Sequence, residues 1–206
     1  RPLSRPGEVL ETIPGVIVTQ HSGTGKANQF FLRGFNLDHG TDFATSFDEI
    51  PINMVSHAHG QGYTDLNFLI PELIETIQYH KGATSIDDGD FASAGTAKIS
   101  SIHSLDRPYV QMTLGKNDLL RVLGVGNLQL QNGEIIAAIE NLNNDGPWIN
   151  PENLSKQNVF LKYFSGDHSK NKSIAFQHYQ SKWDATDQIP ERLIDSGDID
   201  RFGSLN

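Results

Sequence analysis

Two histidines separated by one residue are the part of this sequence whose residue types and spacing come closest to a chemical site. His57 and His59 lie in a loop-like segment, residues 54–64, that also carries two glycines. On an extended segment, side chains two residues apart can point the same way and share a metal ion. One common class of metallohydrolase adds an Asp-His pair two and three residues later, where this sequence has Gln61 and Gly62. Three interpretations stay open: a metal or ligand contact, a metal-dependent hydrolase, and two solvent-exposed loop histidines.

Other short motifs that suggest nucleotide, calcium or hydrolytic sites each lack an essential position. Residues 22–26 read Ser-Gly-Thr-Gly-Lys, but Ala27 stands where a phosphate-binding loop needs the Ser or Thr that binds Mg²⁺. Residues 60–62 begin like a dinucleotide fingerprint, but Asp65 occupies the position of its third glycine. Residues 87–90 lack the EF-hand spacing, and no Ser-His-Asp set has a supporting Gly-x-Ser-x-Gly turn. The sequence therefore predicts no catalytic residues, and a hydrolase is the least favoured reading.

Composition excludes several kinds of protein. The 206 residues include no cysteine, which rules out disulfides and thiolate metal sites. The 25 acidic and 16 basic residues give a net charge of -9, which argues against a nucleic-acid partner because such proteins usually carry a basic patch. No apolar run approaches the roughly 20 residues of a membrane-spanning helix.

Short elements alternate irregularly over the first half of the chain, which predicts a small mixed α/β domain. Residues 4–12 are expected to form a helix that Pro14-Gly15 stops, and residues 65–73 a partly helical segment with Asp65 as its N-cap. Strands are expected at residues 16–19, 28–33, 43–52 with a bend near Pro51, 74–80 and 95–101.

The second half, from about residue 106, has a different pattern of amphipathic strands and polar turns. In residues 120–130, one parity holds Leu, Val, Gly, Gly, Leu and Leu, and Gln131-Asn132-Gly133 is a strong hairpin turn. The same kind of pattern predicts another hairpin, formed by residues 158–164 and 173–183. Strands of about ten residues with this alternation are typical of a transmembrane β-barrel. A soluble antiparallel sheet has the same period, and periodicity alone favours the soluble sheet.

Five motifs stand in a fixed order over the first half, at residues 10–16 (LETIPGV), 31–35 (FLRGF), 47–53 (FDEIPIN), 73–82 (LIETIQYHKG) and 89–95 (GDFASAG). Together they resemble the plug domain of TonB-dependent outer-membrane receptors. The resemblance implies an α+β plug domain, a small mixed sheet with short helices, over residues 1–105. Residues 106–206 then look like the first antiparallel strands of the outer-membrane β-barrel, which reverses the preference for a soluble sheet.

The resemblance also implies a function. Such receptors bind a scarce ligand, such as a siderophore, metal complex or cobalamin, and import it actively through a barrel whose lumen the plug gates. A TonB-type energy-coupling protein and the lipid of the outer membrane of a Gram-negative bacterium would be partners. No cofactor is required, and a transition metal or its complex would be substrate. The alternative is a soluble periplasmic or surface binding module that reuses a plug-like domain.

The family pattern can be carried over to particular residues. It implies that the loop after the third motif reaches the ligand, through His57, His59, Gln61 and Tyr63, with the two histidines as metal ligands. The loops at residues 21–27 and 36–42 are secondary candidates. Structural or gating roles are implied for the motif residues Arg33, Gly34, Asp48, Glu75, Lys81 and Gly82.

Two positions depart from the family pattern, and the strands are too few for a barrel. Glu49 replaces a glycine, which makes a tight turn with positive φ less expected there, and Thr96 replaces a second glycine. A receptor barrel has about 22 strands and the smallest closed barrels about eight, whereas the second half has room for about four to six. An incomplete barrel, and therefore a fragment of a longer chain, is expected.

Overall fold

A computed structural model of the protein describes residues 5–20, 22–166, 170–186 and 188–205. The chain forms two compact units. The first comprises residues 1–21 and 26–102, and the second comprises residues 22–25 and 103–206. In the described residues no helix has both the length and the apolar character needed to cross a membrane.

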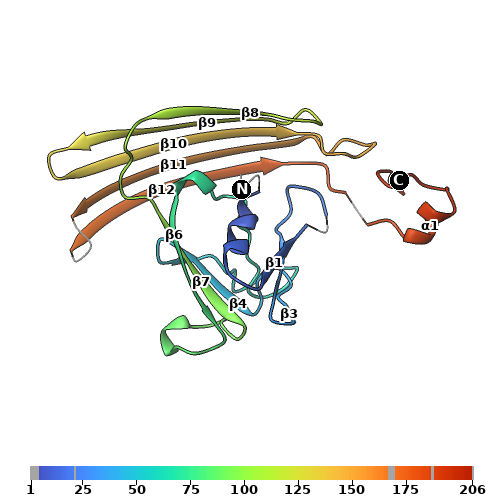
Figure 1. Ribbon diagram of the computed structural model, residues 1–206, viewed down its shortest axis with the longest axis horizontal. Coiled ribbons are helices and arrows are strands. Elements are labelled where there is room, and N and C mark those ends of the chain that lie inside the picture. The colour runs from blue at the N-terminus through green and yellow to red at the C-terminus, as the bar shows by residue number, and fades with distance from the viewer. Residues whose placement is uncertain (1–4, 21, 167–169, 187, 206) are drawn as a thin grey trace. The chain divides into compact units, whose positions relative to one another are not determined.

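The first unit contains two small sheets. One is antiparallel, with the order β1 (Val16–Thr19), β2 (Gln29–Leu32) and β3 (Phe35–Asn36). The other has the order β5-β4-β7-β6 and is mixed, because β4 and β7 run parallel while the outer pairs are antiparallel. Its strands are β4 (Phe43–Phe47), β5 (Ile50–Pro51), β6 (Ile74–Lys81) and β7 (Gly95–Ser101). The predicted mixed domain is thus confirmed, and Figure 1 labels β1 and β3 of the first sheet and β4, β6 and β7 of the second.

One hydrophobic core holds this unit together. A short 3₁₀ helix, η1 (Pro6–Thr12), contributes Val9 and Leu10, and β2 and β4 contribute Phe30 and Phe43. These four side chains are at most 1% exposed. Complete burial of a large apolar side chain contributes about 1.5–3 kcal/mol, so this core is the main stabilising term of the unit.

The helical predictions are only partly right. The N-terminal helix is 3₁₀ rather than α, and it begins at Pro6 after Arg5, which makes no side-chain cap. Residue 4 lies outside the described residues. In residues 65–73 only the turn η2 (Pro71–Leu73) is helical. Asp65 is not an N-cap of a longer helix: its carboxylate accepts a hydrogen bond from the Asn67 amide at 2.8 Å, a local turn that competes with helix formation. A third turn, η3 (Ile86–Asp88), precedes β7.

The bend predicted near Pro51 is a reversal of the chain between β4 and β5. The two turn residues, Asp48 and Glu49, have φ values of 45° and 69°, so the tight turn forms although Glu49 replaces a glycine. Asp48 anchors it, because its carboxylate accepts hydrogen bonds from the Ser101 amide at 2.8 Å and the Ser101 hydroxyl at 2.6 Å. These bonds offset the backbone cost of a non-glycine residue at positive φ.

Gly95 begins β7 at a position where a side chain does not fit. Its φ is 154°, and a Cβ atom there would lie 2.4 Å from the carbonyl oxygen of His80 on the neighbouring strand. We expect Gly95→Ala to lower the free energy of unfolding by roughly 2–4 kcal/mol, from backbone strain and overpacking together. Urea unfolding of the full chain, followed by circular dichroism, measures the loss. Gly60→Ala is the matched control because a Cβ there meets open space; equal stability of the two variants would contradict the prediction.

The second unit is built on a five-stranded antiparallel sheet in the order β12-β11-β10-β9-β8, whose long strands run side by side in Figure 1. Leu130 pairs with Gly133, which confirms the predicted hairpin turn at residues 131–133. In the described residues β8 and β12 each pair with one neighbour, so the sheet is open. A short helix, α1 (Glu191–Asp195), was not expected. The strands are β8 (Tyr109–Leu114), β9 (Leu120–Leu130), β10 (Gly133–Asn144), β11 (Leu154–Gly166) and β12 (Asn171–Lys182).

The exposed face of this sheet is apolar. Ile139 at the middle of β10 is 47% exposed, and its partners in register are Gly124 and Val159. The same face carries further exposed apolar side chains from the other four strands: Val110, Met112, Leu114, Leu120, Leu128, Leu130, Leu161, Ile174 and Phe176.

The opposite face is buried and carries charges. Glu140, 1% exposed, accepts a hydrogen bond from Arg121 Nε at 2.6 Å and lies 3.0 Å from Lys156 Nζ. Asn158 donates to the same carboxylate at 2.8 Å. Lys162 is also buried, at 2% exposed. Apolar side chains are buried on this face as well, among them Leu123, Ile136 and Phe160, so it mixes charged and apolar residues. A soluble antiparallel sheet turns a polar face to water, whereas the exposed face here is rich in apolar side chains.

The segment Ser22–Gly25 belongs to the second unit although it lies early in the sequence. The backbone amide of Thr24 donates to Glu152 Oε2 at 2.9 Å, and the Thr24 hydroxyl donates to the other carboxylate oxygen. Ser22 donates to the Thr186 carbonyl at 2.7 Å, and Thr186 accepts from the Gly23 amide at 2.8 Å. Glu152 is fully buried and is the centre of this attachment.

Candidate functional site

Within the predicted ligand loop, residues 54–64, a pair of backbone hydrogen bonds closes the segment 54–63, called the 54–63 loop, at its base. The Met54 amide donates to the Tyr63 carbonyl at 2.9 Å, and the Gly62 amide donates to the Met54 carbonyl at 2.7 Å. Between these ends His57, His59 and Gln61 are exposed. The loop therefore presents polar side chains to solvent from a fixed base.

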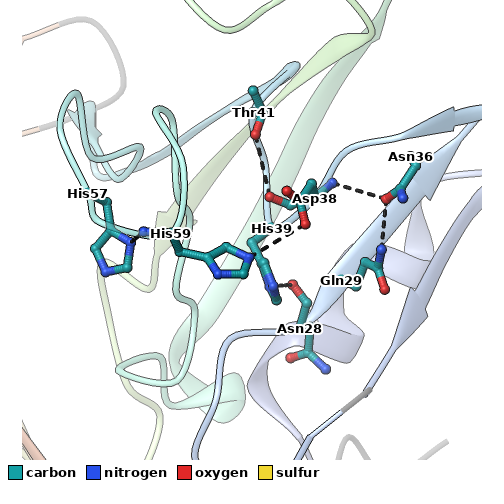
Figure 2. Close-up of polar contacts among 8 residues, drawn as sticks. All are labelled: Asn28, Gln29, Asn36, Asp38, His39, Thr41, His57 and His59. Atoms are coloured by element: carbon teal, nitrogen blue, oxygen red, sulfur yellow. Dashed lines mark hydrogen bonds and ion pairs between the residues drawn. The ribbon is translucent and has the colours of Figure 1, made fainter. Parts of the chain in front are cut away.

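A second loop, residues 36–42, approaches the first and brings ligating groups together. In the described residues, Asp38, His39 and His59 each offer a ligand atom, and these atoms all lie within 4.8 Å of one another. His59 Nε2 is 3.6 Å from Asp38 Oδ1, and the rings of His39 and His59 meet edge to face at 4.7 Å. Figure 2 shows the three side chains converging from the two loops.

The two histidines of the sequence pair take different positions. His59 joins Asp38 and His39, whereas His57 stacks on Tyr63 with ring centroids 4.0 Å apart and an interplanar angle of 14°. His57 Nδ1 accepts a hydrogen bond from the backbone amide of His59 at 3.2 Å. His57 is therefore a neighbour of the cluster and not one of the three residues whose ligand atoms converge, and its predicted role stays a prediction.

Tyr63 forms the floor beneath the histidines. It is 9% exposed, and its ring lies 5.3 Å from that of His39 and 5.9 Å from that of His59. Burial raises the pKa of the Tyr63 phenol above its ordinary value, and the Asp65 carboxylate raises it further, against a hydrogen bond with the Ala27 backbone that lowers it. The phenol therefore stays neutral at physiological pH and supplies an uncharged aromatic surface.

Asn53 holds the two loops together. Its side-chain Nδ2 lies within hydrogen-bond distance of the carbonyl oxygens of Gly40 at 3.1 Å, Phe43 at 3.0 Å and Gly62 at 2.9 Å. Its Oδ1 accepts from the Thr45 amide at 2.7 Å and the Thr45 hydroxyl at 3.1 Å. One amide side chain thus connects the 36–42 loop, β4 and the end of the 54–63 loop.

The 36–42 loop has an unusual backbone. Asp38, His39 and Gly40 have successive φ values of 39°, 66° and 111°. Two adjacent non-glycine residues in this region cost on the order of 1–3 kcal/mol each and persist only where the surroundings hold them. Here the Thr64 amide donates to the His39 carbonyl at 2.6 Å, and His39 Nδ1 lies 2.9 Å from the Asn28 carbonyl.

The other predicted residues occupy turns and strands outside the Asp38–His39–His59 cluster. Arg33 and Gly34 form the positive-φ turn between β2 and β3, and Arg33 is exposed. Glu75 is exposed on β6, and Lys81 ends that strand with its Nζ 5.7 Å from the centre of the Tyr79 ring. Gly82, with φ 86°, follows and donates to the Ala94 carbonyl at 2.8 Å. Their gating roles stay predictions.

Sequence reasoning gave no individual role to Asp38 or Asn53, and it named His39 only as one of several histidines that folding could bring to a site. Asp38 and His39 lie in a loop that the family resemblance marks only as a secondary candidate, and no spacing rule joins them to His59, which is 20 positions away along the chain from His39. Asn53 ends the third motif, but a single asparagine carries no signal of the five contacts it makes. Only folding brings these residues together.

The fold and the loop cluster define a small β-rich domain that presents polar groups from neighbouring loops. A model of the TonB-dependent receptor plug domain matches residues 1–96. This match over the first 96 residues confirms the resemblance read from the five ordered motifs.

Solved structures with the same fold include proteins that are transporters by name. The ferric citrate transporter FecA in its unliganded form aligns over 97% of this chain, with a TM-score of 0.72 and 17% identity. The copper transporter OprC aligns over 88% with a TM-score of 0.65 and 15% identity, and the FrpB iron transporter of Neisseria meningitidis over 85% with a TM-score of 0.61 and 16% identity. This chain spans only 31%, 29% and 28% of those three chains, respectively.

Proposed function

We propose that the chain is part of a TonB-dependent outer-membrane receptor that binds a small molecule or metal complex and imports it, with the plug domain gating the lumen of a barrel. The role is non-enzymatic: binding energy and a pull from a TonB-type energy-coupling protein replace covalent chemistry. The plug-domain match over residues 1–96 supports this, and so does the fold shared with transporters of iron, ferric citrate and copper.

The exposed apolar face of the five-stranded sheet, opposite a face that holds buried charges, is the observation that carries the proposal. An outer-membrane barrel turns apolar side chains toward lipid and polar ones toward its lumen. The exposed face here, with Ile139 at its centre and Ile174 76% exposed, suits lipid, and the buried face carries Glu140, Lys156 and Lys162. A soluble binding module would leave this apolar face in water.

A charge at the centre of the exposed face should therefore disfavour the membrane-bound state. We expect Ile139→Lys to lower the unfolding free energy in phospholipid vesicles by about 2–4 kcal/mol, the cost of a lysine near the bilayer midplane. Urea titration with tryptophan fluorescence measures this. Asn143→Lys is the control, because Asn143 shares the face but lies near the strand end, where the cost falls toward about 0–1 kcal/mol. Equal losses for both variants would argue against a lipid-facing surface.

Cell fractionation and uptake test the whole proposal. The natural gene product should be recovered in the outer membrane, and cells lacking the gene should accumulate less of at least one radiolabelled probe among ferric citrate, cobalamin, zinc and nickel. A protonophore should reproduce that deficit in wild-type cells, because import is energised. Recovery from the soluble periplasm would support the soluble binding module instead. Unchanged uptake of every probe would contradict the proposed import function.

A further inference from the structure

We propose that Asp38, His39 and His59 form a binding site for a single divalent transition-metal ion, with Zn²⁺ the best-matched probe. The claim that a receptor imports this ion rests on the proposed function. The claim that the three residues bind the ion does not depend on it. Two imidazoles and one carboxylate are a ligand set that suits zinc and its neighbours, and three protein ligands leave a position open for water or for transfer.

The distances allow coordination with small side-chain movements. Ligand atoms around a tetrahedral ion at about 2.0–2.2 Å are separated by roughly 3.3–3.6 Å. His59 Nε2 and Asp38 Oδ1 are already 3.6 Å apart, and the whole set lies within 4.8 Å. The Asp38 and His59 side chains are 57% and 37% exposed, so rotation of either can close the remaining gap.

His39 is held in the tautomer that a metal ligand needs. Its Nδ1 lies 2.9 Å from the Asn28 carbonyl oxygen, which can only accept a hydrogen bond. In the neutral imidazole Nδ1 therefore carries the proton, which leaves the lone pair on Nε2. A ligating histidine that donates its other nitrogen to a carbonyl is the usual outer arrangement at metal sites, where it fixes the ring and raises its basicity.

The strained loop backbone gives a second reason to regard this as a built site. Positive φ at both Asp38 and His39 turns adjacent side chains toward His59, in a conformation that is costly without a compensating role. Asp38 is also positioned by its own loop, since its amide donates to Asn36 Oδ1 at 3.2 Å and its carbonyl accepts from Thr41 at 3.4 Å (Figure 2).

The alternative to a metal site is an ordinary surface contact between His59 and Asp38, which would stabilise the protein by about 0–1 kcal/mol. The same unit offers a comparison: His80 Nδ1 lies 3.6 Å from Asp88 Oδ2, the same separation. There, however, Lys98 Nζ lies 3.4 Å from the other oxygen of Asp88, and a fixed cation disfavours a metal ion. His80 is therefore a matched control for a histidine–carboxylate contact that should not bind metal.

Titration calorimetry of the full chain with Zn²⁺, and with Mg²⁺ as a hard-cation control, tests the site. We expect one Zn²⁺ per chain and no comparable Mg²⁺ binding. His59→Ala and Asp38→Asn should each weaken Zn²⁺ binding by at least about tenfold, while His80→Ala changes it less than about twofold. Both altered residues of the site are substantially exposed, so the variants should keep the circular dichroism spectrum of the parent. Co²⁺ should give a visible absorption band that His59→Ala removes.

Several outcomes would overturn the site. They are absence of Zn²⁺ binding by the parent chain, an effect of His80→Ala as large as that of His59→Ala, or a loss in His57→Ala that equals the loss in His59→Ala while Asp38→Asn binds normally. The last result would restore the His57–His59 pair. Because binding is measured on the purified chain, a positive result together with unchanged zinc uptake in cells would reject import and leave the metal site standing.

Discussion

Glu140→Ala is expected to lower the free energy of unfolding of the second unit by about 3–5 kcal/mol, the cost of breaking a buried ion pair by removing one partner. The carboxylate is 1% exposed and faces Arg121 Nε at 2.6 Å and Lys156 Nζ at 3.0 Å. Its removal also takes away the acceptor that Asn158 Nδ2 uses at 2.8 Å. The buried ammonium group of Lys156 would then lie in a low-dielectric interior without its counter-charge.

Urea unfolding in detergent micelles, followed by tryptophan fluorescence, measures this loss. Glu191→Ala on α1 is the control, because Glu191 is exposed and such surface changes usually stay within about 0.5 kcal/mol. Lys156→Met added to Glu140→Ala should recover part of the loss, since it removes the stranded charge. A Glu140→Ala loss no larger than that of Glu191→Ala would show that the carboxylate does not stabilise the sheet.

Asn53→Asp is expected to cost about 2–4 kcal/mol and to weaken Zn²⁺ binding by at least about tenfold. The substitution keeps the shape and the acceptor for Thr45, but it replaces the amide donor that faces the carbonyl oxygens of Gly40, Phe43 and Gly62 with an anionic oxygen. Each buried group left without its hydrogen bond costs about 1–3 kcal/mol. Because this side chain connects both ligand loops, stability and metal affinity should fall together.

Thermal unfolding and Zn²⁺ calorimetry on the same preparation check that coupling. Asn150→Asp provides the comparison, since Asn150 is exposed and donates to Ser204 Oγ at 3.2 Å. An Asn53→Asp protein of normal stability and normal Zn²⁺ affinity would mean that the loops hold their positions without this residue.

The positions of strands could be predicted from the sequence where the alternation of apolar and polar residues and the turn residues indicated the same boundaries. β1 occupies the predicted residues, and the Gln131-Asn132-Gly133 turn joins β9 to β10, because a turn sequence and two flanking alternating runs are local signals. In residues 65–73 the expected partial helix is limited to Pro71–Leu73, and the predicted N-cap at Asp65 is wrong, because its carboxylate accepts from the Asn67 amide in a local turn. The Asp48-Glu49 turn could not be judged from its own residues, since Ser101, far along the chain, stabilises it.

In the candidate site, too, local sequence patterns identify some residues, and others are identified only from the folded structure. His59 could be named from its spacing to His57, but the neighbours whose ligand atoms lie close to it, Asp38 and His39, come from another loop. The tautomer of His39 depends on the Asn28 carbonyl, a backbone atom whose position no side-chain pattern encodes. The face polarity of the second unit could be read as alternation, but which face is buried required the three-dimensional arrangement.

The attachment of Ser22–Gly25 to Glu152 bears on the order of events during folding. Thr24 and Glu152 are 128 positions apart, and Ser22 and Thr186 are 164 apart, so these bonds close very large loops of chain. Contacts of such long range form late and slow the search for the native state. During synthesis, the early segment must wait for the ribosome to release Thr186 before its last partners exist. A chain divided after residue 102 would strand Glu152, fully buried, apart from the threonine it binds.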